Sequence, residues 1–331
     1  MTDLEQGRIL VTGGAGFIGS ALVWELNQRG LENILIADFL RDGEKWKNIA
    51  PLRFVDYVEA STLLELVNDA SSQLSDIRTI FHLGACSSTT ETDAAYLTEN
   101  NYEYTKALAH FALETGRRFV YASSAATYGA RESGLSETLP LASLRPLNVY
   151  GYSKHLFDCY AERMSMLDRI TGIKYFNIYG PNENHKGDMR SVVNKAYYQI
   201  RKTGRISLFK SYRSDCPNGA QRRDFLYVKD AVAATVFLAE QVDGGGLFNV
   251  GSGEAHTFVE LAQAVFSAMG KEVRIDFIDM PEQLRAGYQY FTRADISKLR
   301  AAGFTQPMTS LRDGVRDYVQ AYLQPDLHLG D

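Results

Sequence analysis

A glycine-rich turn near the start of the chain limits the folds open to it. The stretch "VTGGAGFIGS" sets Gly13, Gly16 and Gly19 three residues apart, after the apolar run 8–12 and before an apolar-periodic stretch at 17–30. A side chain at these positions would keep a pyrophosphate away from the backbone N–H groups, and the helix that follows begins with partial positive charge. A glycine-rich turn that binds nothing is the alternative. The strand before and the helix after favour a dinucleotide-binding turn.

Charged residues after the second predicted strand bear on the form of the cofactor. Asp38 ends the run 33–38, about 20 residues beyond the turn, where an acid suits the 2′-hydroxyl of an adenine ribose and favours NAD. Arg41, Lys45 and Lys47 follow at once, and any of them could neutralise the 2′-phosphate of NADP or simply face solvent. The spacing leaves both forms open.

The first half of the chain alternates apolar runs with helical patterns. Runs at 77–83 and 117–123 flank a helical pattern over 94–116, which predicts a parallel sheet covered on both faces. We expect an α/β fold, a Rossmann-type doubly wound parallel sheet with a smaller C-terminal α/β substrate lobe. Residues 1–180 would form the dinucleotide-binding domain and 181–331 mainly the lobe. Later segments would return to the first domain, and the run 173–180 would lie in its sheet.

Composition excludes several classes of function. The net charge of −5 comes from interspersed acids and bases, which does not favour nucleic acid, and 45% of the 331 residues are hydrophobic, enough for a large core. No apolar run reaches the roughly 20 residues that span a bilayer, and the first ten residues lack a signal-peptide pattern. The three cysteines match neither a disulfide framework nor a metal site. We expect a cytoplasmic protein without metal, membrane or nucleic-acid partner.

A tyrosine and a lysine in "NVYGYSK" form the candidate reacting pair. On a helix, Tyr150 and Lys154 lie one turn apart. An ammonium lowers the pKa of a neighbouring phenol from its usual value of about 10, and oxidised nicotinamide adds further positive charge. Tyr150 is therefore a candidate base for a substrate hydroxyl, and Ser124 in "SSAATYG" can hydrogen-bond the reacting oxygen. Without the glycine turn upstream, such a pair would be read as an ordinary helix surface.

These motifs together carry a family resemblance. "TGGAGFIG", "SSAATYG" and "YGYSK" resemble the extended short-chain dehydrogenase/reductase family, in its nucleotide-sugar branch. "GACSSTTE" and "GPNENHKG" are more specific, and with them nearly the whole chain resembles the ADP-L-glycero-D-manno-heptose 6-epimerase family. The resemblance implies inversion of C6 of ADP-D-glycero-D-manno-heptose by transient oxidation and hydride return on bound NADP, for lipopolysaccharide precursor synthesis. It also implies a homo-oligomer, a pentamer.

The resemblance assigns roles to individual residues. Tyr150, Ser124 and Lys154 would be catalytic, with Lys186 as a second acid/base group on the far side of the substrate. From residue type alone, Lys186 would be read as a phosphate-neutralising or exposed loop lysine. The implied cofactor contacts are Gly13, Gly16, Phe17, Ile18, Gly19, Asp38, Phe39, Lys45, Leu83, Gly84, Ala85, Cys86, Ser87, Asn100, Lys154, Ile178 and Lys186. The implied substrate contacts are Ser124, Asn177, Asp188, Lys195, Phe209, Arg223 and Tyr288.

Some positions depart from the family pattern. The family commonly has Glu at Leu83, Arg at Lys174 and a small residue at Asp188, and the loop between Phe209 and Arg223 is longer than in some members. These departures bear on fine specificity more than on reaction class.

Two alanines bear on the reaction class. Ala125 and Ala126 stand where related sugar dehydratases place an Asp-Glu pair, so elimination of water is disfavoured. Two other readings stay open. One is a 4-epimerase of another nucleotide sugar, which would not need Lys186. The other is a non-catalytic dinucleotide-binding regulator, although such proteins often lose the tyrosine or the lysine.

Overall fold

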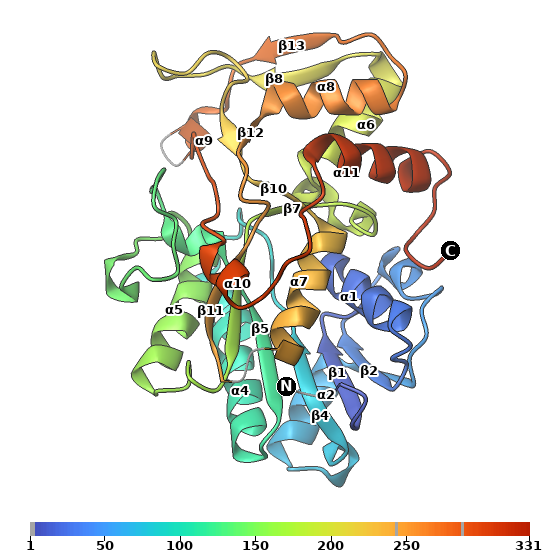
Figure 1. Cartoon of the computed structure of the whole chain (residues 1–331), viewed down its shortest axis with the longest axis vertical. Coiled ribbons are helices and arrows are strands. Elements are labelled where there is room, and N and C mark those ends of the chain that lie inside the picture. Colours follow the sequence, from blue (N-terminus) through green and yellow to red (C-terminus); the bar gives the residue numbers. More distant parts are fainter. Residues whose placement is uncertain (1–3, 242–243, 286–287) are drawn as a thin grey trace.

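A seven-stranded parallel sheet forms the larger part of the molecule, and a smaller lobe lies beyond the carboxyl ends of its strands (Figure 1). The structure, a computed structural model, describes residues 4–241, 244–285 and 288–331. The strand order is β3-β2-β1-β4-β5-β6-β11, so the winding direction reverses between β1 and β4. This is the doubly wound Rossmann topology, which places ligands at the carboxyl ends of the strands beside the reversal. The predicted fold class is confirmed.

Both faces of the sheet are buried, as the continuous apolar runs predicted. Along β1, Ile9 and Val11 join one hydrophobic core and Leu10 joins the other, because successive side chains point to opposite faces. The first core is covered by α1 and α7, the second by α2, α4 and α5. The strands are β1 (Arg8–Thr12), β2 (Ile34–Asp38), β3 (Asp56–Glu59), β4 (Ile77–His82), β5 (Arg118–Ser124), β6 (Thr171–Tyr175) and β11 (Gly246–Val250). The helices are α1 (Phe17–Gln28), α2 (Ala60–Asn68), α4 (Tyr104–Glu114), α5 (Val149–Arg163) and α7 (Val228–Gln241).

The helical pattern over 94–116 is not one regular helix. It divides into α3 (Ala94–Leu97), a π-helical segment Thr98–Glu103, and α4. A π-helical turn rotates the side chains that follow it, and such turns are frequent at functional sites. Here it contains Asn100 and Asn101, next to the loop that follows β4.

The smaller lobe consists of short sheets and helices from the C-terminal part of the chain. Three two-stranded sheets lie in it or join it to the main sheet: β8 (Ile206–Phe209) with β13 (Ile275–Ile278), β9 (Arg222–Arg223) with β12 (His256–Thr257), and β7 (Asn177–Tyr179) with β10 (Phe225–Tyr227). Its helices are α6 (Val192–Thr203), α8 (Phe258–Ala268), α9 (Glu282–Arg285), α11 (Leu311–Asp317) and the π-helical Tyr318–Leu323, whereas α10 (Ser297–Ala301) lies beside β11 of the main sheet (Figure 1). Thr257 and Glu260 form the capping box of α8 that their spacing predicts.

The chain passes between the two parts more than once. The run 173–180 divides: β6 lies in the main sheet, and β7 pairs with β10 between the sheet and the lobe (Figure 1). Further along, α7 returns to cover the sheet, and β11 adds a strand beside β6. Because β6 leads directly into β7, the carboxyl edge of the sheet faces the lobe.

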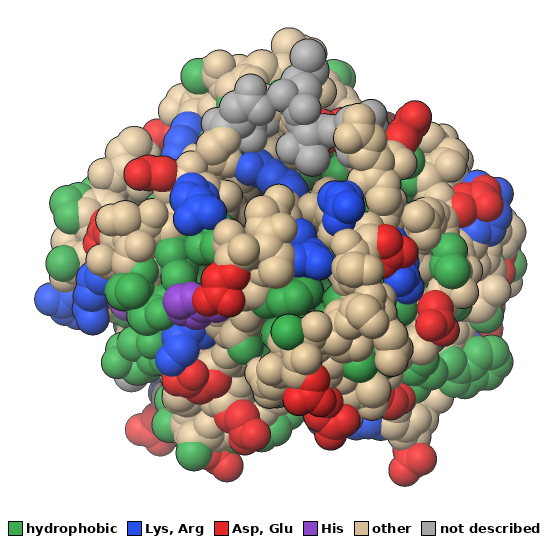
Figure 2. Space-filling model, turned by 90° about the horizontal axis from the view of Figure 1, so that it is seen from below, with side chains coloured by type: hydrophobic (Ala, Val, Ile, Leu, Met, Phe, Trp, Pro, Cys, Tyr) green, Lys and Arg blue, Asp and Glu red, His purple; other side chains and the backbone are tan. Residues whose placement is uncertain are grey.

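Surface charge, helix length and clusters of metal-binding side chains bear on nucleic-acid, membrane and metal binding. Figure 2, a view from the side opposite the lobe, shows acidic and basic side chains interspersed among apolar and other groups. Within the described part of the chain, no helix combines the length and apolarity that a bilayer crossing requires. The same described residues contain no group of three or more His, Cys, Asp and Glu side chains that could hold a metal ion.

Candidate active site

The glycine turn forms a cradle that side chains would fill. Gly13 has a φ of +67°, and a Cβ added there would lie 2.7 Å from the backbone nitrogen of Gly84. A Cβ added at Gly19 would lie 2.0 Å from the carbonyl oxygen of Gly13. Gly16 is the N-cap of α1 and offers no side-chain hydrogen bond, so the first N–H groups of that helix are available to a ligand. This arrangement fits the pyrophosphate of a dinucleotide.

Asp38 and Lys45 lie together beside this turn. The buried Asp38 carboxylate accepts the N–H groups of Ala15 at 2.9 Å and Phe39 at 2.7 Å. Its third partner is the ammonium of Lys45, which also donates to the carbonyl of Phe39 at 3.2 Å. The structure therefore brings the predicted ribose-binding acid and one candidate phosphate-binding base to the same place.

The other bases of this loop have partners elsewhere. Lys47 forms an ion pair with Glu44, and the Arg41 guanidinium lies 5.5 Å from the ring centroid of Phe39. Lys45 is thus the candidate base that contacts Asp38.

The loop after β4 is held against β1. The imidazole of His82 bridges two hydroxyls, with Nδ1 2.7 Å from Thr12 Oγ1 and Nε2 2.9 Å from Thr105 Oγ1. Burial lowers the pKa of His82 well below its usual value, so the ring is neutral. Thr12 Oγ1 also accepts the N–H of Gly84 at 3.1 Å. Of the predicted cofactor contacts 83–87, Leu83 and Gly84 therefore lie against β1 and the glycine turn, Ala85 and Cys86 follow them, and Ser87 is exposed.

Asn101 is a structural contact that the sequence reasoning missed. Its amide accepts the N–H of Cys86 at 2.8 Å and donates to the Cys86 carbonyl at 3.0 Å and to Ser153 Oγ at 2.9 Å. Ser153 donates in turn to the carbonyl of Tyr150 at 2.7 Å, so Asn101 joins the loop after β4 to α5. Its neighbour Asn100 donates to the Tyr96 carbonyl at 2.9 Å, and its role as a cofactor contact stays a prediction. The π-helical turn orients both amides, and no sequence pattern signals it.

Ser124 and Tyr150 meet where β5 and α5 come together. Ser124 is the last residue of β5, and Tyr150 lies in the first turn of α5, where Asn148 Oδ1 caps the helix by accepting the N–H of Gly151 at 2.7 Å. A Cβ added at Gly151 would lie 2.9 Å from the carbonyl oxygen of Ala126, so glycine lets the helix approach the turn that follows Ser124. Ser124 Oγ accepts the N–H of Ala126 at 3.1 Å and lies near enough to Tyr150 to favour ionisation of that phenol.

The protein alone does not lower the pKa of Tyr150. Burial raises it, and the hydrogen bond with Ser124 offsets only part of that effect. Burial lowers the pKa of Lys154 to about 8, against the opposing influence of Asp158 one turn further on. Burial of both groups therefore opposes the lowering expected from Lys154, and a lowered pKa of Tyr150 stays a prediction that includes the positive charge of oxidised nicotinamide.

A buried ion pair underlies the helix that carries these residues. Lys174, where the family commonly has Arg, is fully buried on β6, and its ammonium lies 2.6 Å from Asp158 Oδ2. Asp158 also accepts the hydroxyls of Tyr121 at 2.9 Å and Ser123 at 2.8 Å, while Lys174 donates to Thr127 at 2.8 Å. This network joins α5 to β5, to β6 and to the turn after Ser124.

Lys186 lies against the glycine turn. Its ammonium is 5.1 Å from the ring centroid of Phe17, the first residue of α1. Burial lowers the pKa of Lys186, with the Glu183 carboxylate opposing the shift. Glu183 is itself buried and accepts the Ser191 hydroxyl at 2.6 Å, which fixes the start of this loop relative to α6. The structure thus brings Lys186 to the predicted cofactor site.

The predicted substrate contacts lie in or next to the lobe. Arg223 is buried, with its guanidinium 5.2 Å from the ring centroid of Tyr288 and a hydrogen bond to the Gln289 carbonyl. Asn177 is exposed at the start of β7, followed by the predicted cofactor contact Ile178. The remaining three are Phe209 at the end of β8, exposed Asp188 after Lys186, and exposed Lys195 on α6.

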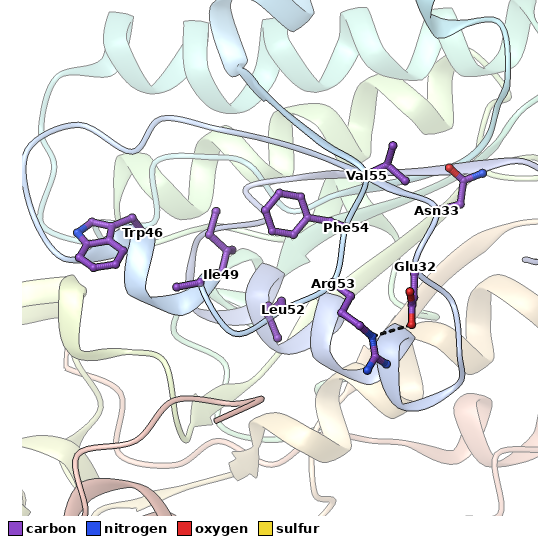
Figure 3. A pocket seen from close by; sticks show the side chains of 9 residues that line it. Glu32, Asn33, Trp46, Ile49, Leu52, Arg53, Phe54 and Val55 are labelled. Carbon is purple, nitrogen blue, oxygen red and sulfur yellow. Dashed lines mark ion pairs between the residues drawn. The ribbon is translucent and has the colours of Figure 1, made fainter.

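A surface hollow lies apart from these residues. Figure 3 shows it between residues 32–33 and 46–55, with the Glu32–Arg53 ion pair at 2.7 Å and Trp46 at one end. None of the predicted site residues lines it. The predicted site residues therefore lie elsewhere, mostly at the carboxyl ends of the strands and in the adjoining loops.

Comparisons with known proteins agree with this geometry. Residues 9–251 match the model of the NAD dependent epimerase/dehydratase family. The chain is 51% identical to an ADP-L-glycero-D-manno-heptose-6-epimerase from Nitratidesulfovibrio vulgaris, over 97% of this chain and 99% of that protein. It resembles the solved Helicobacter pylori protein of the same name (26% identity, TM-score 0.80, covering 97% and 98% of the two chains). It also resembles Thermus thermophilus UDP-glucose 4-epimerase solved with NAD (27% identity, TM-score 0.74, covering 94% and 97%).

Proposed function

The chain belongs to the NAD dependent epimerase/dehydratase family, and on that premise we propose that it inverts C6 of ADP-D-glycero-D-manno-heptose to give the L-glycero epimer, for lipopolysaccharide precursor synthesis. The observation that carries the proposal is the presence of two proton-carrying groups at one cofactor site. Tyr150 lies next to Ser124, which favours its ionised form, and the Lys186 ammonium lies over the ring of Phe17, just after the glycine turn. The name of the 51% identical relative specifies the sugar.

The glycine cradle supports a nicotinamide dinucleotide as the cofactor. When bound, it supplies reversible acceptance of hydride from the sugar carbon. Gly13, Gly16 and the open N-terminus of α1 would hold its pyrophosphate, and Asp38 the adenosine ribose. We infer that the form is NADP, because the Lys45 ammonium beside Asp38 can turn to a 2′-phosphate.

Tyr150 would take the proton of the C6 hydroxyl while the hydrogen on C6 leaves as hydride. Ser124 would hydrogen-bond the same oxygen and fix its direction. Since burial raises the pKa of Tyr150, its ionisation needs added positive charge, and Lys154 lies one helical turn away to supply part of it. The sugar is then a ketone at C6.

Lys186 would serve the opposite face. After rotation of the end of the sugar, the C6 oxygen occupies a different place and needs a second proton carrier. Burial lowers the pKa of Lys186, which brings the ammonium closer to the range in which it can exchange a proton. Ala125 and Ala126 offer no carboxylate for elimination, so return of hydride to the other face completes an inversion.

The direct test follows the configuration of C6 by NMR. Purified protein incubated with ADP-D-glycero-D-manno-heptose should form the L-glycero epimer without net accumulation of NADPH, and deuterium at C6 should remain at C6. Stoichiometric NADPH would identify a dehydrogenase, and loss of label to water would identify proton abstraction. Inversion at C4 of a UDP-hexose, without activity on the heptose, would support the 4-epimerase reading.

The cofactor form has its own test. Titration of the apoprotein should give tighter binding of NADP than of NAD, and Lys45→Met should remove that difference. Equal or tighter binding of NAD by the wild-type protein would show that Asp38 decides the preference.

Assembly, location and domain division stay predictions. Light scattering of the purified protein would test the pentamer, and fractionation of cells would test the cytoplasmic location. Limited proteolysis would test a division near residue 180.

A further inference from the structure

We propose that Asn48 and Asn182 are positioning residues that fasten the loop carrying Lys186 to the glycine turn. The inference rests on the proposed role of Lys186 as the second proton carrier. Both side chains are buried, with exposed fractions of 2% and 4%. Neither belongs to the set of residues that would touch cofactor or substrate.

Asn48 joins two segments that are far apart in the sequence. Its amide nitrogen lies 2.9 Å from the carbonyl oxygen of Ala15, within the glycine turn. The same nitrogen lies 3.1 Å from the carbonyl oxygen of Asn182 and 3.0 Å from His185 Nδ1, both in the loop that carries Lys186. The Asn48 amide thus donates to one acceptor in the glycine turn and to two acceptors in the loop that carries Lys186.

Asn182 adds a second attachment from the other side. Its φ of +73° lies in the left-handed region, which asparagine tolerates better than most residues. Its amide nitrogen donates to the Ser20 hydroxyl of α1 at 3.0 Å, and its Oδ1 accepts the N–H of Leu329 at 3.0 Å. The loop is therefore tied to the first helix and to the C-terminal segment at one residue.

His185 has a defined state in this arrangement. Burial, together with the nearby charges of Lys45 and Lys186, lowers the pKa of His185 to about 4, so the ring is neutral near pH 7. The Asn48 amide donates to Nδ1, which leaves the ring proton on Nε2. The imidazole consequently acts as a fixed acceptor for Asn48 rather than as a mobile charge.

These attachments decide where the Lys186 ammonium lies. Among the described residues, no hydrogen bond or ion pair holds that ammonium, which rests over the ring of Phe17. The backbone from Asn182 to Gly187 is a short turn, so fixing Asn182 and His185 fixes the point from which the Lys186 side chain extends. Loosening them would free the lysine and expose it to water.

The test compares Asn48→Ala with Asn27→Ala as a matched control. Asn27 is buried on α1, and its amide donates to two carbonyls, those of Leu31 and Arg53, away from Lys186. Both variants lose buried hydrogen bonds, so their melting temperatures should fall by similar amounts. Asn182→Gly is the second variant: it keeps the left-handed backbone while removing both side-chain bonds, and it carries the test if Asn48→Ala does not fold.

Two measurements give separate readouts. The first is the rate at which acetic anhydride modifies Lys186 in the apoprotein, measured by mass spectrometry relative to the exposed Lys202. It should rise several-fold in Asn48→Ala and Asn182→Gly but not in Asn27→Ala. The second is epimerase turnover, which should fall roughly 10-fold to 100-fold in the first two variants with the KM for the sugar nearly unchanged.

The possible results distinguish a failure of the positioning role of Asn48 and Asn182 from a failure of the proposed epimerase function. Unchanged Lys186 reactivity in both variants, or an equal rise in Asn27→Ala, would overturn the positioning role even if the wild-type protein is an epimerase. A selective rise in a protein that does not invert the heptose would support the positioning role and overturn the proposed function.

Discussion

Ser124 and Tyr150 come from a strand and a helix, and Asn148 and Gly151 bring their hydroxyls close together. Asn148 begins α5 by capping it, and Gly151 has no Cβ to collide with the carbonyl of Ala126. The Ser124 and Tyr150 hydroxyls are therefore close because α5 can approach the turn that follows β5. Tyr150, the proposed proton carrier, and the residues Asn148 and Gly151 that place it are neighbours in the motif "NVYGYSK".

Removing either proposed proton carrier should slow the reaction sharply. Tyr150→Phe keeps the ring packing and Lys186→Met keeps most of the side-chain length, so we expect turnover to fall by roughly 10²–10⁴-fold with cofactor affinity retained. The assay is C6 inversion followed by NMR, with dinucleotide binding measured in parallel. Tyr152→Phe, on an exposed ring of the same helix, and Lys202→Met, on α6, should keep full activity. Full activity in Lys186→Met would return that residue to a phosphate-binding or loop role.

At the scale of elements, the role of the glycine turn can be tested by comparing two alanine variants that have the same backbone strain. Gly13 and Gly116 have nearly equal φ values of +67° and +68°, but a Cβ at Gly13 would lie 2.7 Å from the Gly84 nitrogen, whereas one at Gly116 meets nothing within 4 Å. Alanine at either position should cost about 1 kcal/mol of backbone strain. Only Gly13→Ala should also displace the loop at Gly84 and weaken dinucleotide binding, measured by titration. Equal weakening in Gly116→Ala would show that strain alone is responsible.

The junction of α5 with the sheet depends on a buried charge pair. Lys174→Met leaves the Asp158 carboxylate buried without its cation, and breaking such a pair typically costs about 3–5 kcal/mol. We expect a loss near the lower value in urea unfolding, because the hydroxyls of Tyr121 and Ser123 still donate to Asp158. Lys174→Arg should recover most of the stability. Arg205→Met, which breaks an exposed pair with Asp276, should leave stability nearly unchanged, and a large effect there would contradict the burial argument.

At the scale of the whole molecule, the two parts are held together by chain crossings and by contacts at the edge of the lobe (Figure 1). The long loop between β8 and β9, which the family resemblance left unassigned, reaches the cofactor-binding part through an ion pair between Arg213 and Glu132 at 2.7 Å. Gln289 reaches the same part through the carbonyl of Gly129. The lobe therefore closes over the carboxyl edge of the sheet, where Ser124 and Tyr150 lie.

Buried neutral histidine should make the stability of the fold fall in acid. His185 has a pKa of about 4 in the folded chain and near 6.5 when unfolded. Between these values the unfolded chain binds the proton and the folded chain does not, so the free energy of unfolding falls as the pH drops from 6.5 to 4. At about 1.4 kcal/mol per pKa unit, the full effect is roughly 3 kcal/mol. Urea unfolding of wild type and His185→Gln across this range should show a shallower slope in the variant, since the other groups titrate in both proteins. Equal slopes would show that His185 does not carry this dependence.

The sequence alone determined the sheet and the residue types of the candidate site, because both depend on local pattern. The strands expected at 8–12, 33–38, 77–83 and 117–123 are β1, β2, β4 and β5, with ends displaced by no more than one residue. Apolar runs of strand length, glycine where a phosphate must approach, and a Tyr-x-x-x-Lys on a helix are all readable within a short window.

Only the tertiary structure decided how these parts are joined. The π-helical turn that directs Asn101 to Cys86, the Lys174–Asp158 pair under α5, and the Asn48 amide that links Ala15 to His185 each join residues distant in sequence. Burial also opposes the lowered pKa expected for Tyr150, because the spacing of Tyr150 and Lys154 shows that the two are close but not how burial acts on each of them. Burial and long-range hydrogen bonds are properties of the packed chain, whereas helix and strand periods are properties of neighbours along it.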